Sequence, residues 1–189
     1  FLKIVIRMIQ NKPIILVDPY PRTMDLLFSK ANLKYLKKNF KLITAPNTNK
    51  NNFYEKKLSK ADYIFGQPNL PTSLISKSTK LKAIFNVESN FMDNMDYDYC
   101  FRKGIHVLAT SPVFAQPVAE MAIGLTLSIA RSIHIAHSDF ISKKEKYGGS
   151  ISQNNFLIKN KTFGLIGFGD LAKSLTPILK AFSYEIVAL

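Results

Sequence analysis

Three small residues at fixed spacing mark the stretch best suited to chemistry: Gly167, Gly169 and Ala172. They follow a short apolar run at 163–166 and precede residues with helical spacing, which predicts a turn between a buried strand and a helix. Gly167 permits a tight turn, Gly169 lets a diphosphate approach the main chain, and Ala172 allows close packing of helix on strand. The free N–H groups at the start of the helix would point at the phosphates.

The residues of this turn are therefore the candidate dinucleotide-binding residues: Gly167, Phe168, Gly169, Asp170, Leu171 and Ala172. A helix is expected over 170–182 and a second strand over 184–189. The alternative interpretation is a plain glycine turn in an unrelated α/β domain. An acidic residue for the ribose hydroxyls is due about 20 residues after the glycines, where the sequence stops at Leu189. We therefore expect a piece of a longer protein that binds NAD, with NADP not excluded.

Apolar runs alternate with helical spacing along the first 110 residues. This alternation predicts a parallel sheet with helices on both faces, wound right-handedly. Strands are expected over 13–18, 40–45, 61–66, 81–86 and 105–109, and helices over 23–38, 53–58, from about 72 to 78, and over 96–103, with a polar loop over 46–52.

A long apolar helix is expected next, from residue 114 or 117 to 131, after a turn at 110–112. Pro117 and Glu120 would lie in its first turn, where proline fits and a carboxylate is favoured by the helix dipole. Because its apolar residues cover nearly the whole circumference, we expect the helix to be buried on several sides and to bridge two α/β units. A polar, helical arm would follow over 132–146.

The charge and cysteine content restrict the possible partners. The formal net charge of +13 could indicate a nucleic-acid-binding module, but the lysines are scattered and not grouped with stacking aromatics, so we favour solvated lysines and expect no nucleic acid. Cys100 is the single cysteine, which rules out an internal disulfide and fits a cytoplasmic setting. We predict no metal site.

We also expect no membrane segment. The apolar run at 118–130 is too short for a bilayer and carries Glu120. The opening residues 1–10 are apolar but short and interrupted by charge, so they predict neither a spanning helix nor a signal peptide.

Several short motifs, in this order and spacing, resemble the N-terminal half of the D-isomer-specific 2-hydroxyacid dehydrogenases. The resemblance covers about 61–189, and its motifs lie at 81–84, 93–96, 103–107, 117–120, 164–169 and 179–182. It implies an α/β fold in which a flavodoxin-like parallel-sheet domain that binds substrate, 1–110, precedes the start of a Rossmann dinucleotide-binding domain. That second part, 111–189, would hold the bridging helix, the arm and the first β-α-β unit.

The resemblance also implies the chemistry: hydride transfer between NAD(P) and a small D-2-hydroxy acid or its 2-oxo acid, in a homodimer formed through the arm. The family's substrate-binding Arg and its proton-transferring His and Glu would follow Leu189, so no catalytic residue is expected here and the chain alone should be inactive. His106, His134 and His137 do not occupy that position and are interpreted as structural or exposed.

The family binds the substrate carboxylate through main-chain N–H groups of an often glycine-rich loop. The corresponding loop, 87–92, has no glycine, and its candidate substrate-binding residues are Ser89, Asn90 and Phe91. An ordinary αβ loop is the alternative. Asp93 and Asn94 are expected to organise the turn and to cap the next helix.

Two departures concern the cofactor helix. Asp170 adds negative charge beside the expected diphosphate, and Pro177 should kink the helix while its first turn survives. The competing function from another class is a non-enzymatic regulator that senses a dinucleotide on the same scaffold.

Overall fold

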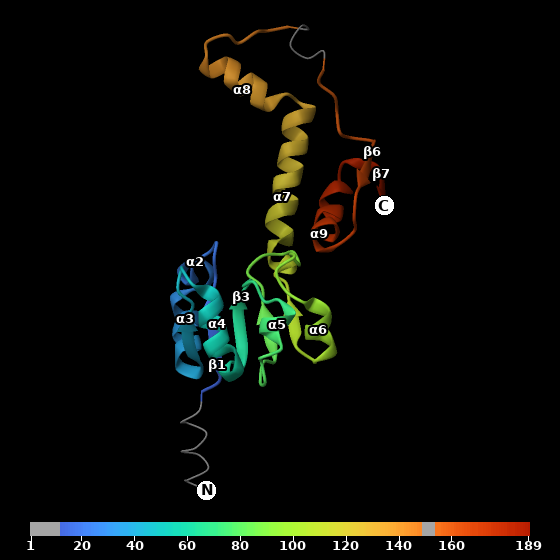
Figure 1. The fold of residues 1–189 in the computed structure, drawn as a ribbon. Coiled ribbons are helices and arrows are strands. Elements are labelled where there is room, and N and C mark those ends of the chain that lie inside the picture. The colour runs from blue at the N-terminus through green and yellow to red at the C-terminus, as the bar shows by residue number, and fades with distance from the viewer. Residues whose placement is uncertain (1–11, 149–153) are drawn as a thin grey trace. The chain divides into compact units, whose positions relative to one another are not determined.

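The computed structural model describes residues 12–148 and 154–189. These residues form two compact units, one that ends at Thr110 and one that begins at Ser111 (Figure 1).

The first unit is built on a five-stranded sheet in which all neighbouring strands are parallel. Its strand order, β2-β1-β3-β4-β5, is the flavodoxin-like one, so the predicted α/β parallel-sheet fold is confirmed. In this order the winding reverses between β1 and β3, and ligands of such sheets bind at the carboxyl ends of the strands beside that point. The strands are β1 (Ile14–Asp18), β2 (Lys41–Thr44), β3 (Tyr63–Gly66), β4 (Ala83–Phe85) and β5 (His106–Leu108).

The connecting helices differ from the expected ones in their bounds. The helix expected over 23–38 is two helices, because the Ser29 hydroxyl accepts a hydrogen bond from Asn32 N and starts a new helix after an extended Phe28. Part of the expected polar loop is helical, since a helix begins at Lys50. The helices are α2 (Met24–Leu27), α3 (Lys30–Asn39), α4 (Lys50–Lys57), the 3₁₀ turn η1 (Leu58–Lys60), α5 (Thr72–Ile75) and α6 (Tyr97–Arg102).

The core of this unit lies on one face of the sheet. Alternate residues of β1, β3, β4 and β5 point there and pack against the helices, as the period of two of a strand requires. They include Leu16, Ile64, Ile84 and Val107, which meet Tyr54, Leu58, Leu74, Ile75 and Cys100. The opposite face, which carries Ile15, Val17, Tyr63 and Phe65, borders an apolar cavity of about 410 Å³ beside α2 and α3.

A buried charge fixes α4 to the end of β1. The carboxylate of Asp18, which is 6% exposed, lies 2.6 Å from Lys50 Nζ and accepts a 3.2 Å hydrogen bond from Tyr54 OH. Burial, followed by the charge of Asp18, raises the pKa of Tyr54 above its ordinary value, so the hydroxyl stays protonated and keeps donating. The helix is thereby held to the sheet at its carboxyl edge.

The second unit combines a long helix with a β-α-β element. Strands β6 (Lys161–Leu165) and β7 (Ser183–Ala188) are parallel neighbours, joined by α9 (Asp170–Leu179). The long helix α7 (Ser111–Ala130) packs along α9 and is followed by α8 (Ile133–Ile141). This is the predicted strand–turn–helix–strand order, although β6 is less buried than expected, since β7 is its one neighbouring strand among the described residues.

The long helix differs from the prediction in where it begins. Ser111 is already helical, so the expected turn at 110–112 is wrong, and Pro117 and Glu120 lie beyond the first turn. The dipole argument for Glu120 therefore fails. Its side chain is exposed and accepts a 2.9 Å hydrogen bond from Gln116 Nε2.

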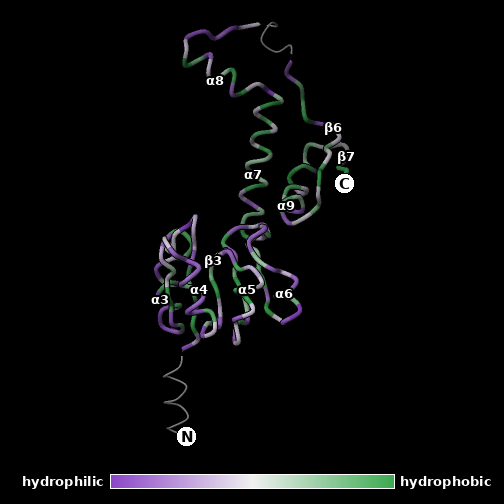
Figure 2. Tube along the Cα trace, in the orientation of Figure 1, coloured by the Kyte–Doolittle hydropathy of each residue, from purple (hydrophilic) through white to green (hydrophobic). Residues whose placement is uncertain are grey.

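The burial expected for this helix is also wrong within the described chain. Only Ala115, Ala119 and Ala130 of α7 are buried, whereas large apolar side chains remain exposed, among them Met121, Leu125 and Ile129. Figure 2 shows hydrophobic residues along the length of α7. By length and composition this 20-residue helix could cross a membrane, a test that the core helix of a soluble protein also passes, and the expected run at 118–130 is only part of it.

Substitution of Gly66 tests how closely the main chains of β1 and β3 approach each other. Gly66 has φ +138°, and a Cβ at this position would lie 2.0 Å from the carbonyl oxygen of Asp18. We expect Gly66→Ala to lower the free energy of unfolding by about 3 kcal/mol. Gly124→Ala on α7 is the matched control. A Cβ at this position would meet no atom within 4 Å outside the helix's own backbone, so alanine should raise the free energy of unfolding by up to about 1 kcal/mol. Urea denaturation followed by circular dichroism measures both, and an unchanged midpoint for Gly66→Ala would contradict the proposed clash.

Candidate functional site

The glycine turn leaves an open corner of main chain in the second unit. β6 ends at Leu165, Gly167 has φ +86°, and Gly169 is the residue that precedes α9. A Cβ built on either glycine would meet no other atom within 4 Å. Two main-chain hydrogen bonds to the residue after β7 fix the turn: Gly167 N donates to Leu189 O at 2.8 Å, and Leu189 N donates to Leu165 O at 3.0 Å. The turn is thus fixed in shape and has free space in front of it.

The start of α9 has no side-chain cap, because Gly169 has none to offer. The first N–H groups of a helix without a cap are available to an anion, and the helix dipole favours negative charge there. Beside the turn is a small apolar cavity of about 170 Å³. Its lining comes from the end of β6, the turn and α9 (Leu165, Ile166, Gly167, Leu171, Ala172, Leu175) and from α7 (Val118, Ala119, Ala122).

The side chain of Asp170 is engaged with α7. Its Oδ2 accepts a 2.6 Å hydrogen bond from the hydroxyl of Ser111, the first residue of that helix. This contact joins residues far apart in the sequence, and the spacing of the glycine motif gives no signal for it. One oxygen of the carboxylate that was expected to oppose an anion is therefore occupied by a donor.

Pro177 lies inside α9 and does not end it. The helix runs from Asp170 to Leu179, and the hydroxyl of Thr176 donates to Ala172 O at 2.8 Å. Because the hydrogen bond that Pro177 removes and the carbonyl that its ring approaches lie after the first turn, the first turn of α9 is helical, as expected.

The second candidate site is the loop after β4 in the first unit. Ser89 is partly buried, while Asn90 and Phe91 are exposed. No residue of the loop has a positive φ, so it adopts its shape without glycine. Among the described residues, no hydrogen bond engages the main-chain N–H of Ser89, Asn90 or Phe91.

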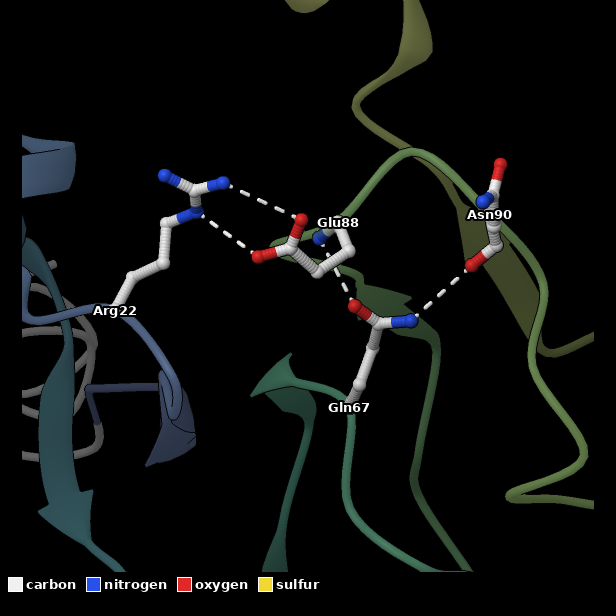
Figure 3. Close-up of polar contacts among 4 residues, drawn as sticks. All are labelled: Arg22, Gln67, Glu88 and Asn90. Carbon is white, nitrogen blue, oxygen red and sulfur yellow. Dashed lines mark hydrogen bonds and ion pairs between the residues drawn. The ribbon is translucent and has the colours of Figure 1, made fainter.

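Side chains from two other loops hold the start of this loop (Figure 3). Arg22 pairs with both carboxylate oxygens of Glu88, at 2.9 and 3.3 Å. Gln67 accepts a hydrogen bond from Glu88 N at 2.9 Å and donates to Asn90 O at 3.1 Å. Sequence analysis missed Arg22, Gln67 and Glu88. The sequence could have indicated them, because each follows the carboxyl end of a parallel strand and those ends meet at one edge of the sheet.

The end of the loop is held by α6 and its cap. Met92 N donates to Tyr97 OH at 3.1 Å, and the ring of Phe91 packs against the ring of Tyr97 with centroids 4.9 Å apart. Tyr97 OH in turn donates to Asn94 Oδ1 at 2.8 Å.

The helix cap itself is Asp96, which accepts from Tyr99 N at 2.8 Å, so the expectation that Asp93 and Asn94 cap α6 is wrong. Hydrogen bonds from the Thr72 hydroxyl and from Tyr99 N–H lower the pKa of Asp96. Asn94 instead donates to Pro68 O at 2.8 Å.

The histidines do not contribute to either site. His106, His134 and His137 are exposed, and His134 Nδ1 lies 3.3 Å from Ser128 Oγ. Within residues 12–148 and 154–189, no group of three or more His, Cys, Asp and Glu side chains could hold a metal ion.

Known proteins share both the sequence pattern and the fold. A hydroxypyruvate reductase from Thermotoga maritima is 38% identical over 97 residues, which are 51% of this chain and 31% of that enzyme. A glyoxylate reductase from Thermococcus litoralis is 29% identical over 119 residues, which are 60% of this chain and 35% of that enzyme. This chain thus spans about a third of the length of such curated relatives.

Solved structures agree over nearly the whole chain. A phosphoglycerate oxidoreductase from Rhizobium etli is 36% identical with a TM-score of 0.77, and the match covers 94% of this chain and 56% of that one. An NAD+-bound 3-phosphoglycerate dehydrogenase from Entamoeba histolytica shares the fold, with 19% identity and a TM-score of 0.60. The match covers 95% of this chain and 54% of that one.

The family model that matches is the D-isomer specific 2-hydroxyacid dehydrogenase catalytic domain, over residues 23–185. That range includes both the loop after β4 and the glycine turn before α9. The chain therefore belongs to the D-isomer specific 2-hydroxyacid dehydrogenase family.

Proposed function

We propose that this protein works as an NAD(P)-dependent oxidoreductase that interconverts a small D-2-hydroxy acid and its 2-oxo acid. The observation that carries the proposal is the open main-chain corner at Gly167 and Gly169, directly before the uncapped start of α9. Family membership supports the reaction class. A bound dinucleotide would supply or accept the hydride.

In this proposal, residues 167–172 hold the diphosphate of the dinucleotide. The space in front of Gly169 admits the phosphates, and the first N–H groups of α9 donate to them. NAD is our first choice, supported by the NAD+-bound dehydrogenase with the same fold. NADP is an alternative, since an NADPH-dependent glyoxylate/hydroxypyruvate reductase from Sinorhizobium meliloti also shares the fold.

The substrate carboxylate would bind to the loop after β4. The N–H groups of Ser89, Asn90 and Phe91 are the available donors there, and a carboxylate accepts from main-chain N–H groups with charge-assisted strength. The names of the related reductases support a small 2-oxo acid such as glyoxylate or hydroxypyruvate as the substrate.

We also propose a cytoplasmic setting without a nucleic-acid partner. Cys100 is a buried free thiol, as expected for a protein in a reducing compartment. The positive net charge would serve to attract anionic substrate and cofactor.

We expect the 189-residue chain by itself to bind NADH but not to catalyse its oxidation. The resemblance places the family's Arg, Glu and His after Leu189, so the chain should bind NADH but not oxidise it with glyoxylate or hydroxypyruvate. NADH fluorescence measures the binding and NADH absorbance measures the oxidation. Oxidation by the purified chain would contradict this assignment of the chemistry, and absence of NADH and NADPH binding would overturn the proposed function.

Substitution at the glycine corner tests the cofactor site directly. We expect Gly169→Val to weaken NADH binding at least about 10-fold, because the side chain would fill the space of the diphosphate. Folding should be unaffected, since the residue is extended and its Cβ would meet no atom within 4 Å. Gly164→Val on β6 is the matched control, also without neighbours within 4 Å, and should bind NADH like the wild type. Equal binding by both variants would contradict the proposed site.

We further propose that the protein forms a homodimer through α7 and α8. Several large apolar side chains of these helices are exposed, including Leu125, Ile129, Phe140 and Ile141, and a second copy would cover them. Sedimentation equilibrium should give twice the mass of one chain. The double change Phe140→Lys and Ile141→Lys should shift the chain toward monomer, whereas Leu26→Lys on α2 should not. A wild-type chain that sediments as a monomer would contradict the dimer. So would a chain that pellets with lipid vesicles in a co-sedimentation assay, because lipid would then cover these side chains.

A further inference from the structure

We propose that Gln67 is a positioning residue for substrate binding: its side-chain amide fixes the glycine-free loop after β4 so that the N–H groups of residues 89–91 face a carboxylate. The inference rests on the proposed function and adds to it the device that shapes the substrate site.

The two hydrogen bonds of Gln67 span the loop. Oε1 accepts from Glu88 N at 2.9 Å, and Nε2 donates to Asn90 O at 3.1 Å. Figure 3 shows Gln67 between these two residues, with Arg22 on the other side of Glu88. A primary amide can accept at one end and donate at the other, which a hydroxyl, carboxylate or ammonium group of similar length cannot do in this arrangement. The main chain on both sides of Ser89 is therefore held by a single side chain.

This brace determines which main-chain groups remain available. It uses the N–H of Glu88 and the carbonyl of Asn90, and Tyr97 OH accepts from the N–H of Met92 at the other end of the loop. Between these fixed points, the N–H groups of Ser89, Asn90 and Phe91 have no acceptor among the described residues. The Asn90 carbonyl oxygen accepts from Gln67 Nε2 and so has a donor of its own.

The hydrogen bonds of Gln67 shape the loop in the way that glycine residues would in a glycine-rich loop. A main-chain anion site is commonly shaped by residues with positive φ, which glycine adopts freely. No residue of this loop has positive φ, so its shape comes from side-chain bonds supplied by a neighbouring strand end.

Arg22 completes the arrangement by compensating the charge of Glu88. A free carboxylate at the start of the loop would repel an anionic substrate, but the guanidinium pairs with both of its oxygens at 2.9 and 3.3 Å. Both side chains are partly exposed, 39% and 30%, so solvent screens the pair and its effect is local.

Glyoxylate titration of the ¹⁵N-labelled 189-residue chain, followed through the amide resonances of residues 89–91, tests the inference. The wild type should show saturable shifts at these amides. Gln67→Met keeps the length of the side chain but makes neither hydrogen bond, and we expect its affinity for glyoxylate to fall about 10-fold. Gln116→Met on α7 is the matched control and should bind like the wild type.

Gln67→Glu separates positioning from a general effect on folding. At neutral pH the carboxylate can accept from Glu88 N but cannot donate to Asn90 O, so binding should again weaken. Protonation restores a donor, so the deficit relative to the wild type should narrow as the pH falls toward about 4. This variant also decides the question if Gln67→Met does not fold.

The outcomes are distinguishable. Amides 89–91 that do not shift in the wild type would overturn the proposed substrate loop, and the role of Gln67 with it. A wild type that binds glyoxylate, with equal affinity in Gln67→Met or with a Gln67→Glu deficit that does not depend on pH, would overturn only the role of Gln67.

Discussion

Both candidate sites depend on main-chain N–H groups that have no acceptor within residues 12–148 and 154–189. In the second unit they are the first N–H groups of α9, and in the first unit they belong to Ser89, Asn90 and Phe91. Such groups bind anions well because they carry no counter-charge and are fixed by the fold. Substrate and cofactor in the proposed reaction are both anionic, so one physical principle serves both.

The two sites keep these groups accessible in different ways. At the glycine turn, Gly167 and Gly169 have no side chains, and apart from their chain neighbours no described residue has an atom within 4 Å of the position that a Cβ would take. In the loop after β4, access comes from added contacts, because Gln67 and Tyr97 hold the loop at both ends. The first arrangement is encoded within a few consecutive residues, whereas the second requires three separate strand ends.

The long helix α7 shows how an apolar sequence can leave its burial undetermined. Its residues are hydrophobic on most sides, yet in the described chain α9 covers only part of them. An apolar helix must be covered by something, and composition alone does not distinguish a core, a partner subunit or lipid. The exposed carboxylate of Glu120 and the hydrogen bond that it accepts from Gln116 mark one polar side of the helix.

Local pattern was enough to predict the parallel α/β fold and the position of the glycine turn. Alternating apolar runs report strands and helices directly, and the G-x-G-x-x-A spacing reports a turn because only small residues satisfy it. Helix ends were predicted less well: Ser29 divides one expected helix, and α7 begins at Ser111, before both expected starts, residues 114 and 117. Capping depends on single hydrogen bonds, which several nearby residues could make equally well.

The sequence by itself determined the order of strands and helices along the chain, the family to which the chain belongs, and the position of the glycine turn at which we propose that a diphosphate binds. Only the tertiary structure decided that Arg22, Gln67, Glu88 and Asn90 form one network, and that Ser111 donates to Asp170. The physical reason is that parallel strands bring residues from distant loops to a common edge. A hydrogen bond across that edge depends on distances that no local spacing specifies.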